Sequence, residues 1–234
     1  MSRAHKPIAT QPLDFWLARG AILVIAGLQF AVVNDLSIGP RWLAPAIELA
    51  LLAPLSVATA WTQRKARRAS SDDQWEAVDV VFRRVRWMAI ALTALATLMN
   101  FGSLIRLVQA MLVGHASDGR TLLLDAVNIW LANVVIFALW FWTIDRSGPT
   151  GSAAGSDCNT DFVFTQQQIR TPQFKDWTPG FIDYLFLAFT NATAFSPADT
   201  FPVSHRAKLL MMAESGTSLI TIALVAARAV GILS

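Results

Sequence analysis

A few polar and ionisable residues lie inside long apolar segments of this 234-residue chain. Glu48 lies about two turns inside one segment, and Asn191 and Glu214 lie in the last two. Ionisable residues are costly inside a bilayer and usually serve ion pairing, proton transfer or substrate passage. We therefore predict Glu48 to be a proton-sensitive group, or alternatively to pair with a basic side chain of a neighbouring helix.

The other candidates differ in their expected depth. Glu214 and Asp125 lie within one or two turns of the ends of their segments, so we expect both to be near the membrane interface and hydrated. Asn191 is costlier to bury, and we expect it to meet a partner helix or a cavity.

Seven consecutive residues, beginning near the end of this Asn-containing segment, form a candidate pore or turn. Asp199 would attract cations at a pore mouth, or it simply begins a turn together with Pro202. Thr193 either lines a pore or bonds back to helix carbonyls, as Thr190 would. The candidate residues are Thr193, Ala194, Phe195, Ser196, Pro197, Ala198 and Asp199.

The composition indicates a membrane protein. Hydrophobic residues make up 54% of the chain and charged residues 15%, far from the averages of soluble domains. A helix needs roughly 20 apolar residues to cross the bilayer, and five segments meet that requirement. They are Phe15 to Val33, Trp42 to Trp61, Trp87 to Ile105, Leu122 to Ile144 and Leu209 to Leu233.

One further apolar segment, Phe181 to Phe195, is too short to cross as a helix, since about 15 residues cover roughly 22 Å. It either re-enters or crosses as a short sixth helix. The predicted fold is therefore an all-α bundle of five full transmembrane helices plus this segment. The predicted regions are 1–146, which is transmembrane with an interfacial helix near 71–86, the polar connection 147–180, and 181–234, which holds the short helix, the turn and the last span.

The sequence "YLFLAFTNATAFSPADTFPVSHRAKLLMMAESG" resembles the pore helix, filter and inner helix of two-helix, pore-loop potassium channels. The resemblance implies a descending helix, a turn and a return. Such a filter uses the glycines of a Thr-Val-Gly-Tyr-Gly-Asp run. Ser196 and Ala198 replace both glycines here, and Pro197 fixes its own φ, so a potassium-selective filter is not expected. The matching residues are Thr193, Asp199, Pro202, Ser204, Lys208, Glu214 and Gly216.

Most of the chain also resembles a family of uncharacterised bacterial multi-span membrane proteins. The shared features are "RKARR" after the second span, "WTPGFIDYLF" and "FTNATAFSPADT" followed by "SHRAK". This resemblance implies a multi-pass protein of the bacterial inner membrane and implies no activity.

The sequence lacks the motifs that mark several kinds of functional site. The three histidines and Cys158 show no metal-ligand spacing, and no phosphate loop, nucleophile elbow or HExxH motif is present. We expect no enzyme, no cofactor, no metal site and no nucleic-acid partner.

The basic residues predict a topology that opposes the channel resemblance. Seven Arg and Lys residues lie in the loop 63–86, which places that loop and the N-terminus in the cytoplasm. Two spans later, the connection 147–180 would be cytoplasmic as well, whereas a potassium-channel pore loop enters from outside. The expected function is a channel-like membrane protein, not potassium-selective, that passes a monovalent cation as a homo-oligomer. The alternatives are a non-conducting assembly protein or a small proton-sensitive transporter.

Overall fold

The computed structural model describes residues 12–31, 46, 72–113, 119–145, 160–169, 171, 177–193 and 200–233. These residues are mostly helical. The elements are α1 (Pro12–Ala31), α3 (Asp72–Val113), α4 (Gly119–Asp145), β1 (Phe162–Phe164), α5 (Thr165–Gln168), α6 (Phe181–Ala192), β2 (Thr200–Pro202) and α7 (His205–Leu233).

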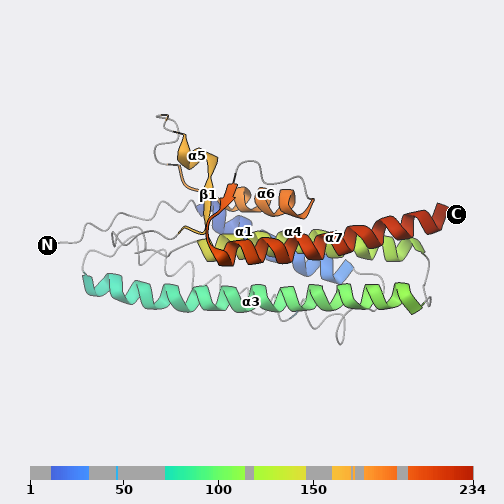
Figure 1. The fold of residues 1–234 in the computed structure, drawn as a ribbon. Helices are drawn as coiled ribbons and strands as arrows, with labels where there is room; N and C mark the ends of the chain where they lie inside the picture. Colours follow the sequence, from blue (N-terminus) through green and yellow to red (C-terminus); the bar gives the residue numbers. More distant parts are fainter. Residues whose placement is uncertain are drawn as a thin grey trace.

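Helix α4 is the central element of the bundle. It contacts α1, α3, α6 and α7, and its side chains include the fully buried Ala138 and Phe141. The three long helices α3, α4 and α7 lie side by side along the long axis of the molecule, and α6 covers part of that length (Figure 1). The larger hydrophobic cluster joins α1, α3, α4, α6 and α7 through aliphatic and aromatic side chains.

Helix α6 is a half-length helix that runs antiparallel to α4. Its first residue, Phe181, packs edge-on against Trp142 at the end of α4, with ring centroids 6.0 Å apart. Near its other end, Phe189 packs against Trp130 at 5.9 Å. Its 12 residues therefore follow α4 to about its middle, a rise of roughly 18 Å.

The chain then returns to the end of the bundle where α6 began. Strand β2 pairs antiparallel with β1, and Val163 lies opposite Phe201. Helix α7 begins three residues after β2, and Val203 N–H donates to the carbonyl of Asp161 at 2.9 Å. The starts of α6 and α7 thus lie at the same end of the bundle (Figure 1).

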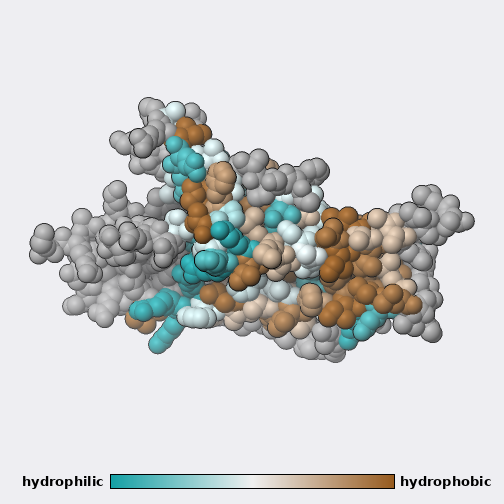
Figure 2. Space-filling model, viewed as in Figure 1, coloured by the Kyte–Doolittle hydropathy of each residue, from teal (hydrophilic) through white to brown (hydrophobic). Residues whose placement is uncertain are grey.

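The basic residues of α3, Arg83, Arg84 and Arg86, lie about three to four turns after its start and come to this end too. Arg86 donates a hydrogen bond to the carbonyl of Ile144, next to the last residue of α4, at 3.2 Å. On the face shown in Figure 2, hydrophilic residues gather around this end, and hydrophobic ones mainly cover the half toward the C-terminal end of α7. On this face, the described surface is therefore divided along the bundle axis.

In the part of the chain that the structure describes, three helices are long and apolar enough to cross a membrane: Arg83–Leu112, Arg120–Asp145 and His205–Ala227. They correspond to the predicted third, fourth and fifth spans. The predicted first span forms a shorter apolar helix, Trp16–Leu28, and Trp42 to Trp61 lies outside the described residues apart from Ala46. Five full spans thus remain a prediction.

Two features differ from the expected all-α layout. Residues 72–86 form the first turns of the continuous, 42-residue helix α3 rather than a separate helix, because no proline or glycine lies between Asp72 and Phe101. The connection after α4 contributes a strand, β1. Alternating aromatic residues, Phe162 and Phe164, bury one face of that strand, with 0% and 1% exposure. This part of the polar connection therefore packs into the core of the bundle, against Phe141 of α4 and Tyr184 of α6.

Candidate functional site

The polar groups of helix α6 are arranged by its local sequence. Gly180 N–H donates to the carboxyl group of Asp183 at 2.7 Å, which satisfies a free donor at the helix start. Thr190 and Thr193 donate to carbonyls of the preceding turn, those of Phe186 and Phe189, each at 2.9 Å. These threonines thus bond back to their own helix, one of the two alternatives that the sequence left open.

Asn191, in the last turn of α6, connects this helix to α7. Its amide nitrogen donates to Glu214 Oε2 at 2.7 Å and to the carbonyl of Met211 at 3.0 Å. A backbone carbonyl can only accept, so the contact with Met211 fixes which end of the amide faces α7. Asn191 therefore meets a partner helix through both hydrogens of its amide group.

A second asparagine reaches the same turns of α7 from α4. Asn133 donates to the hydroxyl of Ser218 at 3.0 Å and to the carbonyl of Glu214 at 3.5 Å. We call Asn133, Asn191, Glu214 and Ser218 the buried polar cluster, because none is more than 8% exposed. This cluster joins α4, α6 and α7 at the depth where α6 ends.

Glu214 is the ionisable member of this cluster. Its side chain is 0% exposed, and Oε1 has no hydrogen-bond partner among the described residues. A buried carboxyl oxygen without a partner is uncommon in folded proteins and points to a specific role. Glu214 is therefore the residue around which we build the candidate site.

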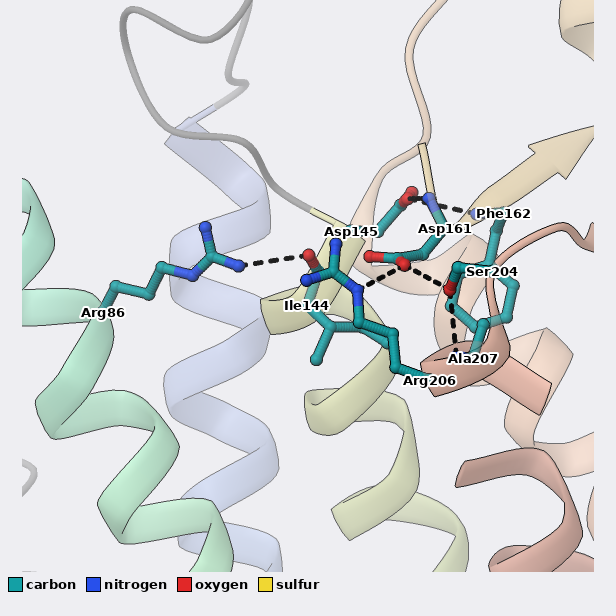
Figure 3. Close-up of polar contacts among 8 residues, drawn as sticks. All are labelled: Arg86, Ile144, Asp145, Asp161, Phe162, Ser204, Arg206 and Ala207. Carbon is teal, nitrogen blue, oxygen red and sulfur yellow. Dashed lines mark hydrogen bonds and ion pairs between the residues drawn. The ribbon is translucent and has the colours of Figure 1, made fainter. Parts of the chain in front are cut away.

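A separate polar network lies at the end where α6 and α7 begin (Figure 3). The carboxyl group of Asp145, at the end of α4, accepts hydrogen bonds from the backbone N–H groups of Asp161 at 2.7 Å and Phe162 at 3.2 Å through one oxygen. Its other oxygen accepts from the hydroxyl of Tyr184 on α6 at 2.6 Å. One side chain thus fastens both β1 and α6 to α4.

Asp161 continues this network to α7. Its Oδ1 accepts from the hydroxyl of Ser204 and from Arg206 Nε, the latter at 2.6 Å. Ser204 also accepts a hydrogen bond from Ala207 N–H at 3.1 Å and so caps the start of α7. Asp161 lies between Ser204 and Arg206 in Figure 3. We call the contacts among Asp145, Asp161, Tyr184, Ser204 and Arg206 the polar clasp.

The expected hydration of Glu214 and Asp125 is wrong. Both side chains are buried inside the protein, with 0% and 1% exposure, because neighbouring helices cover the faces of α7 and α4 that carry them. Position along an apolar segment predicts depth in a membrane but says nothing about which face meets another helix. Glu48 and the run 194–199, with Ala194, Phe195, Ser196, Pro197, Ala198 and Asp199, lie outside the described residues.

Most residues of the polar clasp were not predicted from the sequence. Asp145, Asp161, Tyr184 and Arg206 belong to four separate segments, and none was a candidate. A usable signal was the pair of aspartates flanking the Gly/Ser-rich stretch, followed by the alternating aromatics of β1. Among the described residues, no group of three or more His, Cys, Asp or Glu side chains could hold a metal ion.

Comparison with protein-family models, curated proteins and solved structures finds no match for this chain. The candidate site therefore rests on the geometry of the described residues.

The contact between Asn191 and Glu214 generates a stability prediction. Asn191→Ala removes two hydrogen bonds and leaves a buried carboxyl group with neither oxygen partnered by a described residue. We expect the free energy of unfolding to fall by roughly 1–3 kcal/mol. Reversible unfolding of the protein in mixed micelles measures this change. Thr190→Val is the matched control, since Thr190 bonds within its own helix, and equal losses in the two variants would contradict the prediction.

The polar clasp generates a second, graded prediction. Tyr184→Phe removes one hydrogen bond and should cost about 0.5–1.5 kcal/mol. Asp145→Asn should cost more, because an amide nitrogen cannot accept and one side of the clasp loses its acceptor. Thermal unfolding in detergent gives the order of the two losses. Thr217→Val, which removes a hydrogen bond within α7, serves as the control. Equal losses of stability in all three variants would contradict the prediction.

Proposed function

We propose that this chain is an integral membrane protein of channel-like architecture, in which α6 and the start of α7 form a re-entrant hairpin of the pore-loop type. The observation that carries the proposal is the half-length helix α6, which ends at about the middle of α4 while α7 begins again at the end where α6 began. A helix that stops at half depth is tolerated in a membrane where protein or water covers its freed polar groups.

The chemistry at the end of α6 supports cation passage. A helix C-terminus carries a partial negative charge, and half-helix C-termini coordinate cations in transporters. The buried carboxyl group of Glu214 contacts the last turn of α6 through Asn191. Both features favour a monovalent cation over an anion near the tip of the hairpin.

The proposed placement in the membrane follows from charge. Arg83, Arg84 and Arg86 begin the first of the long apolar helices, and Arg206 and Lys208 lie in the first turns of α7. Positive residues mark the cytoplasmic side, so the hairpin opens toward the cytoplasm of an inner-membrane protein. This orientation is opposite to that of potassium channels, and the run 194–199 lacks their glycines.

One hairpin per chain cannot enclose a pore, so conduction requires several copies around an axis. The exposed side chains of α6 and α7 offer apolar faces for such packing or for lipid. They include Ile182, Phe186, Phe189, Leu209, Met212 and Leu219.

A second candidate function, a non-conducting assembly protein, is favoured by a different observation. Asn191, Thr190 and Thr193 all find hydrogen-bond acceptors within the chain. A hairpin satisfied in this way can act as a packing element. That candidate predicts a co-purifying protein partner and no ion flux.

Reconstituted liposomes provide the direct test of conduction. We expect cation flux above that of empty liposomes, with little discrimination in favour of potassium. Dye-reported flux of potassium, sodium and protons compares the three ions in one preparation. A folded, oligomeric preparation without flux of any of the three ions would rule out the channel proposal in favour of the assembly candidate.

Cys158 tests the proposed orientation, because it lies in sequence between Asp145 and Asp161, which meet at the basic end. We expect a membrane-impermeant maleimide to leave Cys158 unmodified in intact cells and to label it after lysis. Mass spectrometry of the labelled peptide gives the result. A Cys158→Ser, Gly114→Cys double variant, whose new cysteine directly follows α3 in the sequence, is the control and should label in intact cells. The reverse pattern would place the basic end outside.

A further inference from the structure

The unpartnered oxygen of Glu214 has a definite place in the bundle. Oε2 is held by Asn191 at 2.7 Å, whereas Oε1 has no partner among the described residues, and the whole side chain is 0% exposed. Asn191 lies in the last turn of α6. The free oxygen therefore belongs to a carboxyl group at the tip of the half-length helix, where the proposed pathway would pass.

The groups that face Glu214 are neutral. Asn191 contacts it from α6, Asn133 contacts its backbone carbonyl from α4, and Ser218 lies one turn further along α7. No described charged side chain interacts with it electrostatically. Helix α3 meets α7 near Leu224 and Val225, which pack on an apolar cluster that contains Leu104 and Leu107. Among the described residues, no basic partner neutralises this carboxyl group.

The donors around Glu214 decide which cation fits. A sodium or potassium ion needs several oxygen ligands, as in carbonyl-lined filters. Asn191 and Asn133 instead turn their amide nitrogens toward Glu214 and its backbone, and both hydrogens of each amide are engaged by acceptors. A proton requires a single oxygen, and Oε1 is available for it.

We propose that Glu214 is the proton-binding site of the hairpin, with Oε1 as the oxygen that takes up and releases the proton. This inference rests on the proposed function and narrows its cation to the proton. In the uptake step, Oε1 forms an O–H bond with a proton from hydronium and leaves a water molecule. In the release step, that O–H bond breaks and the proton passes to water. Asn191 is a positioning residue that holds Oε2 and leaves Oε1 free.

A hydrophobic carbodiimide tests the site without any flux measurement. Such reagents react with protonated carboxyl groups in apolar surroundings and form a covalent N-acylurea on that carboxyl group. The full-length protein in liposomes is treated with dicyclohexylcarbodiimide and mapped by peptide mass spectrometry. We expect an adduct on Glu214 that disappears in Glu214→Gln. Asp183→Asn is the matched control, since Asp183 lies at the other end of α6. In this variant the adduct on Glu214 should persist.

Proton flux in the same liposomes separates this inference from the proposed function. We expect at least a tenfold loss of proton flux after carbodiimide treatment and in Glu214→Gln, and no loss in Asp183→Asn. An adduct on Glu214 without any flux would support the proton site and overturn the channel proposal. Absence of the adduct in folded wild-type protein, or full proton flux in Glu214→Gln, would overturn the proton site. The adduct is measured on the wild-type chain, so this result stands even if the variant fails to fold.

Discussion

The carboxyl group of Asp145 is the contact on which the arrangement of this end of the molecule depends. It accepts three hydrogen bonds, two from the backbone of β1 and its preceding residue and one from Tyr184. Through Asp161 the same network reaches Arg206 and the capping residue Ser204. Two backbone N–H groups and a phenol would otherwise be left without these acceptors at a buried junction, which is costly. The starts of α6 and α7 are held together because they share this network.

The clasp leaves the far end of α6 to be fixed by packing and by the buried polar cluster. Edge-on aromatic contacts, such as those of Phe181 with Trp142 and Phe189 with Trp130, follow the whole length of the helix. Such pairs contribute about 0.5–1.5 kcal/mol each beyond the burial of their area. Asn191 adds the directional contact that sets how α6 is rotated against α7. Aromatic packing thus sets the position of the helix, and the amide sets its orientation.

The elements that could be predicted from the sequence are those that depend on local runs of residues. The lengths of the apolar segments indicated α3, α4 and α7 and the shortness of α6, because span length is a property of consecutive residues. The clasp could not be predicted in this way. Asp145 and Tyr184 are 39 residues apart and Asp161 and Arg206 45 apart, and no periodicity links them. The burial of Glu214 was missed for a related reason, since the face of α7 that meets α4 and α6 is defined by those helices.

The polar clasp and the buried polar cluster, which hold the two ends of α6, differ in the free energy needed to open them. Opening the clasp would break the three hydrogen bonds of Asp145 as well as the ion pair of the buried Asp161 with Arg206, a pair that solvent screens because Arg206 is 57% exposed. The cluster at the tip of α6 contacts Glu214 through the neutral amides of Asn191 and Asn133, whose individual bonds contribute about 1 kcal/mol each. About eight residues of α7, roughly 12 Å of helix, separate the two. A motion of the hairpin would therefore pivot at the clasp and open at the tip, where Glu214 lies.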